Sequence, residues 1–445
     1  MRVYKFGGSC LTSPASLERV RELVGAAGLP LLCVFSALRG VTDRLLALFE
    51  RAVATGEVPA EAQALLAEHR AYLEPLPAVR RAPAEAQLAA LGAELERTLL
   101  GVALLGEPSA RARDRALSFG ERAAVVLAAA LLAEAGLAVE ADASADTGLL
   151  TDAVHGDARI LPDSRPHVLA RYRGRRGVVL VPGFIGRSRS GAITTLGRGG
   201  SDYTATYLGA VLGATTTLWK DTQGLLTADP RLVAAPRRLT QIHYLDALEL
   251  AHYGTRAIAD RAILPCMQAR TPIEIRGFLH PEEVTRIDGR EAGVLAVSSV
   301  AEAVMVDFLG TGRDMLRTLA RLLSALAERN TYPLLVTEAS PRGETSIVLK
   351  QGDLGLLEQL LEEHQIDEQP LVREDIGLVA MIGSRMRGRV GFAAAIFETL
   401  AAHRINILAI AQTASERNVS VILERDRVPE AVAALHERFI ERELD

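Results

Sequence analysis

Continuous apolar runs and stretches with helical spacing take turns along the first 280 residues of the chain. Apolar runs that end at glycine or polar residues are typical of strands covered on both faces, and four of them are RVYKF (2–6), PLLCVFSA (30–37), GVVLVPGFIG (177–186) and TTTLWKD (215–221). After the first run, Ser13 and Pro14 form the start signal of a helix in SPASLERVRELVGAAG (13–28), a capping hydroxyl followed by a first-turn proline. Strand, glycine loop, helix and strand predict an α/β fold, a largely parallel sheet covered by helices on both faces.

Residues 44–138 are rich in Ala, Leu, Glu and Arg at helical spacing, which predicts a layer of helices. Because proline removes a helical hydrogen bond, we expect breaks in this layer at Pro59, Pro75, Pro77 and Pro83. The most apolar part, AAVVLAAALLA (123–133), has about half the length of a membrane span, and charged residues close it on both sides. We therefore expect a buried helix there and no membrane anchor.

The pattern changes near residue 295 to two weakly similar units. The first contains AVMVDFLG, MLRTLARLLSALAERN and TSIVLK, and the second contains IGLVAMIG, GFAAAIFETLAAHRIN and VSVILE. Each unit has the order strand, helix, strand, strand, helix, which is that of a small α+β module. We therefore predict three domains: an α/β domain over residues 1–290, a first module over 295–370 and a second module over 371–445.

The composition is typical of a globular protein with a small-molecule partner. Of the 445 residues, 49% are hydrophobic and 24% are charged, and the net charge is −5 without a sustained basic block, so neither nucleic acid nor a membrane is an expected partner. The three cysteines are scattered without CxxC spacing, and the N-terminus has no signal-peptide core, which together predict a cytoplasmic protein. The nine histidines show no ligand spacing, so we expect no protein-built metal site.

Two glycine-rich loops carry the candidate chemistry. In TTLGRGGSDYTA (194–205), glycines allow backbone N–H groups to approach an anion at a helix start, and Arg198 can grip a carboxylate or phosphate with two hydrogen bonds. KFGGS (5–9) repeats this arrangement at the end of the first strand, where α/β sheets bind ligands. Neither loop has a Walker A or GxGxxG pattern, so a nucleotide would be bound in another way. Glu121 and Asp221 are further candidates, although an acid at a helix start or a turn more often serves local structure.

Six motifs resemble, in order and spacing, the signatures of aspartate kinases, members of the amino-acid kinase family: VYKFGGSCL, SALRGVTD, SFGERAA, PGFIG, TTLGRGGSDYTA and LWKDTQGLLTADPR. The two C-terminal modules resemble the tandem ACT domains of that family, which are ferredoxin-like. The resemblance covers nearly the whole chain. It implies an amino-acid kinase fold and transfer of the γ-phosphoryl group of ATP, with Mg²⁺, to the side-chain carboxylate of L-aspartate, the first step toward lysine, threonine and methionine.

The resemblance also implies roles for individual residues. Lys5 would neutralise charge on the transferring phosphoryl group, and Asp202 would orient Lys5. Arg198 would bind a substrate carboxylate and Glu121 would face the ammonium group, in an amino-acid site formed by Thr42, Glu121, Phe184, Arg198 and Ser201. The nucleotide would be bound by Lys5, Gly7, Gly8, Ser9, Lys220, Asp221, Leu226, Asp229, Arg231 and Arg256.

Some segments depart from the family pattern. In YGTRAIADRAI, Arg256 stands where lysine is usual; in the first module, GTGRDMLRTL lacks the usual glycine-containing helix start, and Pro333 stands where an effector-contacting acid is common. We therefore expect a weak response to lysine or threonine alone, from a homodimer that pairs through the ACT modules. The chain ends within the second module, so an appended homoserine dehydrogenase is not expected. Two alternatives stay open: a related kinase that phosphorylates another acidic metabolite, and a catalytically silent ACT sensor of amino acids.

Overall fold

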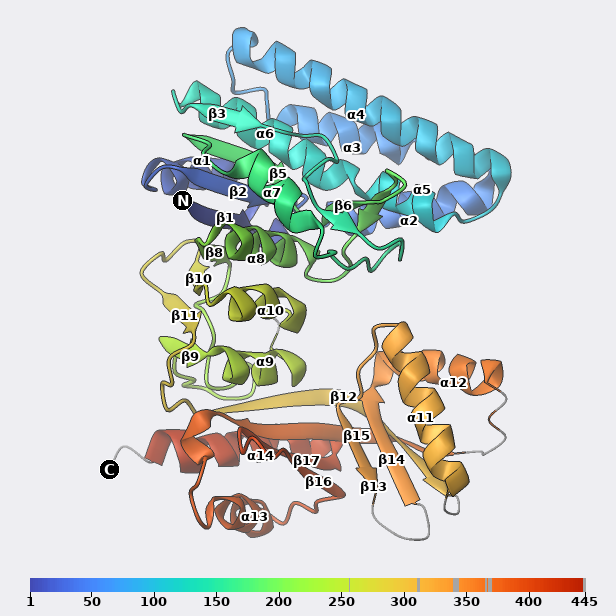
Figure 1. The fold of residues 1–445 in the computed structure, drawn as a ribbon, viewed down its shortest axis with the longest axis vertical. Helices are drawn as coiled ribbons and strands as arrows, with labels where there is room; N and C mark the ends of the chain where they lie inside the picture. The colour runs from blue at the N-terminus through green and yellow to red at the C-terminus, as the bar shows by residue number, and fades with distance from the viewer. Residues whose placement is uncertain (256, 310–312, 339–343, 365, 367–369, 443–445) are drawn as a thin grey trace. The chain divides into compact units, whose positions relative to one another are not determined.

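Figure 1 shows the fold in the computed structural model, which describes residues 1–442 apart from 256, 310–312, 339–343, 365 and 367–369. The chain forms two compact units, each made of two segments. The first unit comprises Met1–Gly224 and Ala257–Gly289, and the second comprises Leu225–Arg256 and Arg290–Asp445. The segment 225–256 thus groups by its contacts with the C-terminal part of the chain.

A largely parallel sheet forms the centre of the first unit, with the strand order β3-β5-β2-β1-β8-β10-β11. Neighbouring strands are parallel as far as β10, and the β10–β11 pair is antiparallel. Every residue of β2 and β5 is buried, in agreement with their continuous apolar sequences. The bounds are β1 Arg2–Phe6, β2 Leu31–Phe35, β3 Val139–Ala141, β5 Val178–Pro182, β8 Thr215–Lys220, β10 Ile273–Gly277 and β11 Val284–Asp288. A small second sheet contains β4 Leu150–Thr151, β6 Ile185–Ser188 and β7 Ile193–Thr195.

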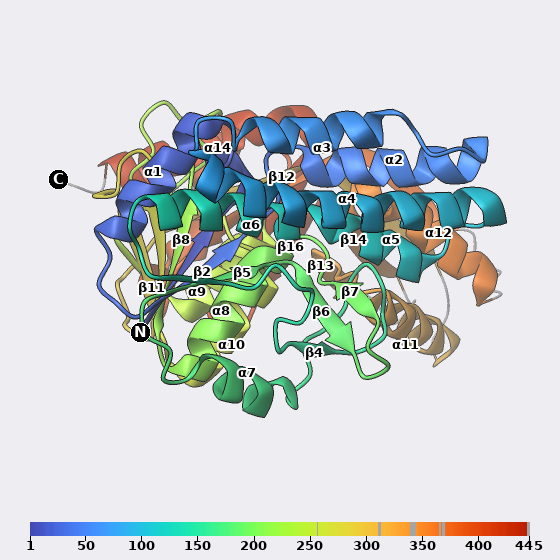
Figure 2. The ribbon, with the colours of Figure 1, turned by 90° about the horizontal axis from the view of Figure 1, so that it is seen from above.

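Helices cover both faces of the large sheet, which confirms the predicted fold class. Helix α6 packs on β2, β3 and β5 from one side, and α8 packs on β1, β2 and β8 from the other (Figure 2). The hydroxyl of Ser13 accepts a hydrogen bond from Ser16 N–H and caps α1, as predicted. The helices of this unit are α1 Pro14–Gly25, α2 Val41–Thr55, α3 Glu61–Ala71, α4 Ala78–Leu105, α5 Ala110–Leu117, α6 Phe119–Glu134, α7 Ser164–Tyr172, α8 Gly200–Leu212 and α10 Asp260–Ala269.

Two predictions about the helical layer have different outcomes. The expected break at Pro83 is wrong, because α4 continues through this proline and packs its long apolar side against α2 and α6. A proline in the second turn of a long, well-packed helix costs one internal hydrogen bond and a local adjustment, which the packing outweighs. The expected buried helix is confirmed: the stretch Ala110–Glu134 is long and apolar enough to cross a membrane, but 78% of its most apolar window is buried inside the protein, as in a core helix.

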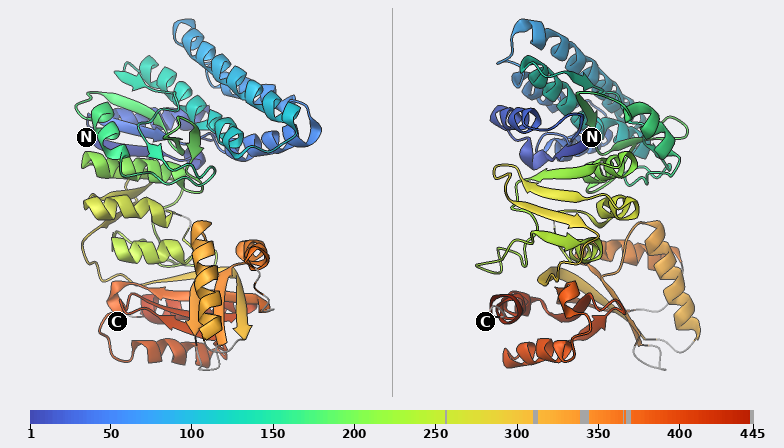
Figure 3. Two further views of the ribbon diagram at one scale, coloured as in Figure 1. Left: turned by 45° about the vertical axis from the view of Figure 1, so that its right-hand side comes forward. Right: turned by 60° about the vertical axis from the view of Figure 1, so that its left-hand side comes forward.

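One antiparallel sheet of six strands runs through the second unit, in the order β13-β14-β12-β15-β17-β16 (Figures 1 and 3). The long strand β12 pairs with β14 along one edge and with β15 along the other, and so joins the two modules. Each module has the predicted order strand, helix, strand, strand, helix. The first consists of β12 Ala296–Leu309, α11 Arg313–Glu328, β13 Leu335–Glu338, β14 Glu344–Lys350 and α12 Leu354–Glu363, and the second of β15 Leu371–Ile382, α13 Phe392–Ala402, β16 Ala409–Gln412, β17 Asn418–Glu424 and α14 Val428–His436. Residues 310–312 of GTGRDMLRTL lie outside the described residues.

Candidate active site

Two lysines share one aspartate at the carboxyl end of the parallel sheet. Lys5 lies near the end of β1, Lys220 ends the adjacent strand β8, and Asp202 lies in the first turn of α8. Lys5 Nζ is 2.7 Å from Asp202 Oδ1, and Lys220 Nζ is 2.6 Å from Asp202 Oδ2. Lys5 is 5% exposed and Asp202 is 4% exposed. Because one carboxylate faces two cations, this cluster can attract a further anion.

Burial and charge oppose each other in this cluster. Burial by itself raises the pKa of Asp202, but the charges of Lys220 and Lys5 outweigh it and bring that pKa to about 2. Burial lowers the pKa of Lys5, and the charge of Lys220 lowers it further, against the attraction of Asp202. Asp202 is therefore ionised at neutral pH, and an anion bound beside Lys5 would favour the protonated lysine.

The glycine loop after β1 leaves space beside Lys5. Gly7 has an ordinary φ of −77°, so its backbone conformation does not require glycine. A Cβ at Gly7 would lie 3.1 Å from Lys5 Nζ, and a Cβ at Gly8 would lie 3.1 Å from the carbonyl oxygen of Ala37. Ser9 follows in the short 3₁₀ turn Gly8–Cys10. A side chain at either glycine would crowd this region, so the loop keeps room for a ligand next to the lysine.

The loop between β7 and α8 is fixed through its backbone. Gly197 and Gly199 adopt left-handed conformations, with φ of 64° and 73°, and the exposed Arg198 lies between them. The guanidinium of Arg261 donates two hydrogen bonds to the carbonyl oxygen of Arg198, at 3.1 and 2.6 Å, and pairs with Asp157 at 2.7 Å. Arg261 was not among the residues predicted from the sequence, where the one signal for it is its place in the divergent segment YGTRAIADRAI.

A buried aspartate supports the same loop from the other end. Asp114, in α5, is completely buried, and its carboxylate accepts hydrogen bonds from the N–H and the hydroxyl of Thr195 at 3.1 and 2.6 Å. It also accepts one from Gly156 N–H at 3.2 Å and lies 2.7 Å from His155 Nδ1. Thr195 ends β7 and directly precedes the loop. Asp114 could not be recognised from the sequence, because one acid in the arginine-rich stretch RARDRAL looks like an exposed charge.

Glu121 carries an incompletely satisfied carboxylate. It lies in the first turn of α6 and is 3% exposed. Burial raises its pKa to about 8, although a hydrogen bond from the backbone of Ala37 and the charge of Lys5 oppose this. Its Oε2 is buried and has no hydrogen-bond partner among the residues that the structure describes. A buried acceptor of this kind suits a cationic ligand group.

Of the other predicted amino-acid residues, Thr42 and Ser201 lie at helix starts, and Phe184 lies between β5 and β6. Phe184 has a positive φ of 66°, which is rare for a bulky residue and found where surrounding structure enforces it. Its ring lies over Gly200, where a Cβ would be 2.9 Å from Cδ2, and the buried Ser201 follows directly. Thr42 is half-buried in the first turn of α2. The preceding Val41 packs against Gly120, next to Glu121.

The predicted nucleotide residues belong to two groups. The first unit contains Lys5, Gly7, Gly8, Ser9, Lys220 and the exposed Asp221, and the second contains Leu226, Asp229 and Arg231. In the second group, Asp229 Oδ1 accepts hydrogen bonds from the backbone N–H and the Nε of Arg231, at 2.9 and 3.0 Å. Arg256 lies outside the described residues.

Within the described part of the chain, no three His, Cys, Asp or Glu side chains gather so as to hold a metal ion. A Mg²⁺ that arrives with a nucleotide takes most of its ligands from phosphate oxygens and water. The positive Lys5–Lys220 cluster and the open glycine loop therefore fit a nucleotide that brings its own metal.

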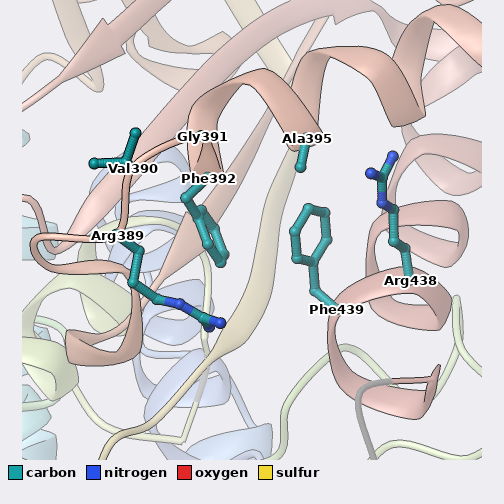
Figure 4. A pocket seen from close by; sticks show the side chains of 7 residues that line it. All are labelled: Arg389, Val390, Gly391, Phe392, Ala395, Arg438 and Phe439. Carbon is teal, nitrogen blue, oxygen red and sulfur yellow. The ribbon is translucent and has the colours of Figure 1, made fainter. Parts of the chain in front are cut away.

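A separate open groove of about 290 Å³ lies in the second ACT-like module. Figure 4 shows the rings of Phe392 and Phe439 side by side, with Arg389 and Arg438 on either side of them. Arg438 donates hydrogen bonds to Thr399 and Glu398, so its charge is partly compensated. These residues belong to the second unit, whereas the predicted amino-acid residues belong to the first.

Comparison with known proteins decides the family. A model described as the amino acid kinase family matches residues 1–277, and one described as an ACT domain matches residues 379–439. The chain belongs to the amino acid kinase family. Aspartokinase 2 of Bacillus subtilis is 32% identical over 355 residues, covering 77% of this chain and 86% of that protein.

Solved structures agree with this assignment. Aspartokinase III of E. coli in complex with aspartate and ADP, in its R-state, matches with a TM-score of 0.84 and 25% identity over 99% of both chains. The same enzyme in complex with lysine and aspartate, in its T-state, matches with a TM-score of 0.76 and 26% identity over 99% of both chains. The predicted amino-acid kinase fold, the C-terminal ACT domain and the aspartate kinase function are thus confirmed, and ATP with Mg²⁺ is the cofactor. The roles of single residues stay predictions.

Proposed function

We propose that the cluster of Lys5, Asp202 and Lys220 is the phosphoryl-transfer centre of this aspartate kinase. MgATP supplies the γ-phosphoryl group, and the acceptor is the side-chain carboxylate of L-aspartate, which becomes 4-phospho-L-aspartate. Lys5 neutralises charge that develops on the transferring phosphoryl group. Asp202, whose Oδ1 is 2.7 Å from Lys5 Nζ, holds the ammonium group of this lysine in place. Because a carboxylate is already an adequate nucleophile, positioning and charge stabilisation carry the reaction and no general base is needed.

The amino-acid site in this proposal lies between the loop 196–200 and the starts of α2 and α6. Arg198 binds a substrate carboxylate with two parallel hydrogen bonds, and Arg261 supports it by holding its backbone carbonyl. Glu121 binds the ammonium group with the carboxylate oxygen that has no partner among the described residues. Thr42, Phe184 and Ser201 complete the walls.

The nucleotide in this proposal is bound by Lys5, Lys220, Asp221 and the loop Gly7, Gly8 and Ser9, and by Leu226, Asp229, Arg231 and Arg256. The positive charge of the lysine pair and the space beside Gly7 support the phosphate part of this assignment. The adenine part rests on the resemblance of LWKDTQGLLTADPR to the family motif.

We also propose a domain division and an assembly: a catalytic domain over 1–290, ACT modules over 295–370 and 371–445, and a cytoplasmic homodimer that pairs through these modules. Apolar side chains that are exposed in the second unit support pairing there, and they include Val336 in β13, Leu371 in β15 and Ile410 in β16. An amino-acid effector would act at these modules, with a weak response to lysine or threonine alone. Light scattering with and without millimolar lysine and threonine tests the pairing, and a monomer would contradict it.

The shared carboxylate of Asp202 between two lysines is the observation that carries the proposal. A coupled assay of ADP release over a panel of acidic amino acids tests it, with hydroxylamine trapping of the acyl phosphate. Turnover with aspartate above that with all other acids is expected. Preference for another acid would favour the related kinase, and release of no ADP with any acid would favour the silent sensor.

A further inference from the structure

The segment 225–238 is tied to the second ACT module through a buried hydrogen bond. Thr227 lies in this segment, between Leu226 and Asp229, and is 4% exposed. Its Oγ1 lies 2.8 Å from Nε2 of His436, the last residue of α14, and His436 is completely buried. All these residues belong to the second unit.

The partners on both sides set the direction of this hydrogen bond. His436 Nδ1 lies 2.8 Å from Oε1 of Glu441, which can only accept when it is ionised, so Nδ1–H donates to it. Thr227 Oγ1 already accepts a hydrogen bond from Arg237 N–H at 2.9 Å. The hydroxyl proton of Thr227 can then point at Nε2 of His436, which accepts it in the imidazole tautomer that has its proton on Nδ1. This series of hydrogen bonds runs from Arg237 N–H through Thr227 and His436 to Glu441, and each group in it has a partner of the correct kind.

Further contacts make Thr227 the centre of this attachment. Its carbonyl oxygen accepts a hydrogen bond from Val297 N–H in β12 at 2.7 Å, and its own N–H donates to the carbonyl of Arg237 at 2.8 Å. The next residue, Ala228, and Val233 are buried in one core with residues of the second module, among them Val421, Leu435 and Phe439. The conformation of the stretch that contains Leu226, Asp229 and Arg231 is therefore held by contacts with the second module.

The helix that follows this stretch is attached to the same module. Helix α9 spans Tyr244–His252. The completely buried Asp246 pairs with Nη1 of Arg417 at 2.6 Å, and Glu249 accepts a hydrogen bond from Asn418, the first residue of β17. The two attachments lie on either side of residues 229–243, so this part of the chain cannot shift against the second module without breaking buried polar contacts.

We propose that His436 is a positioning residue for ATP: through Thr227 it fixes the nucleotide-binding stretch that contains Leu226, Asp229 and Arg231. This inference rests on the proposed assignment of these three residues to the nucleotide. His436 touches no reacting group, and its effect is on how well the stretch is held in its binding conformation. Loss of the contact should then weaken ATP binding and leave the aspartate site unchanged.

The test compares variants that remove or keep the hydrogen bond. His436→Phe keeps a ring in the buried position but removes Nε2, Thr227→Val keeps the shape but removes the hydroxyl, and Thr227→Ser keeps the hydroxyl. We expect the first two to raise the KM for ATP about three- to tenfold, with the KM for aspartate and kcat within about twofold of the original values. Thr227→Ser should restore a nearly normal KM for ATP. Because the two groups share one contact, the double variant should be no worse than the more impaired single variant.

Two controls separate this inference from general destabilisation and from failure of the proposed function. His403→Phe, at an exposed histidine of the same module, should leave both KM values unchanged. Arg231→Gln should raise the KM for ATP if the stretch binds nucleotide. If Arg231→Gln raises it and Thr227→Val does not, the positioning role of His436 is wrong while the nucleotide assignment stands. If neither raises it, both are wrong. Equal changes in both KM values, or effects that add in the double variant, would also overturn the inference, and Thr227→Val and Thr227→Ser decide it should His436→Phe not fold.

Discussion

Glu121 offers a sharp test of the aspartate site, because its pKa of about 8 lies within the range in which the enzyme can be assayed. In the free enzyme at pH 7, a carboxyl group with this pKa is about one-tenth ionised. If the substrate ammonium group binds the carboxylate form, the apparent KM for aspartate should fall about tenfold per pH unit as the pH rises toward 8 and should level off above it. Between pH 6.5 and 8.5 the expected fall is at least about tenfold.

The assay measures initial rates of ADP release at saturating ATP, with aspartate varied at each pH, and the KM for ATP over the same range is the internal control. Glu121→Gln cannot ionise, so its KM for aspartate should be high at every pH and should lose this dependence. Calorimetry in buffers of different ionisation enthalpy should show uptake of a proton by the buffer when aspartate binds at pH 7. If the KM for aspartate stays constant or rises with pH while the KM for ATP changes little, Glu121 does not have this role.

Substitutions at three residues test the phosphoryl-transfer centre and the substrate clamp. Lys5→Ala and Lys5→Arg should each lower kcat about a hundredfold, from roughly 3 kcal/mol of lost charge stabilisation, whereas Lys350→Arg at an exposed lysine should not change it; a near-normal kcat for Lys5→Ala would remove Lys5 from the mechanism. Arg198→Lys should raise the KM for aspartate about ten- to a hundredfold, because lysine keeps the charge but cannot form two parallel hydrogen bonds; an effect on the KM for ATP alone would assign this arginine to the nucleotide. Asp202→Asn should lower the free energy of unfolding by about 3 kcal/mol at pH 7, since it leaves the buried Lys5 and the partly buried Lys220 without a carboxylate. The pKa of Asp202 is lowered from 3.8 to about 2, so its stabilising contribution is fully present above pH 4 and is lost as the pH falls through 2, and the stability curves of the two proteins in urea should converge there.

The sequence was informative where local pattern decides structure. Strands β2 and β5 are buried on both faces, and their unbroken apolar runs predict this burial. The position of residues 225–256 could not be predicted in this way. A buried residue such as Val233 is recognisable as apolar, but the pattern does not say against which segment it packs, and most residues of the core that it shares lie far along the chain, between Leu295 and Ile440. The contact between Thr227 and His436 could not be predicted for the same reason, because no residue near either of them in the sequence indicates that the two side chains meet.

The same distinction applies to the candidate site: its motif residues could be predicted from the sequence, whereas their pairing and their supporting residues could not. The resemblance to a family selected Lys5, Lys220 and Asp202, but their pairing depends on the parallel register of β1 and β8, which brings two lysines to one carboxylate. The supporting residues Asp114 and Arg261 escaped notice because both hold backbone groups of a loop rather than forming a recognisable motif. Loop geometry of this kind depends on which backbone carbonyls and N–H groups are left without partners in the folded chain.

Composition, taken together with the geometry, supports the central role of the two lysines. The chain has 50 Lys and Arg residues, and three of them are lysines: Lys5, Lys220 and Lys350. Two of the three meet at Asp202. In a chain that has arginine at nearly every basic position, a buried lysine is expected where arginine does not fit. A guanidinium is wider than an ammonium group and stays charged under all assay conditions. The region beside Lys5 Nζ is narrow, because a Cβ at Gly7 would lie only 3.1 Å from this nitrogen. The compact ammonium group can turn its three donors from Asp202 toward a phosphate in that space, which a planar guanidinium could not do without displacing the glycine loop.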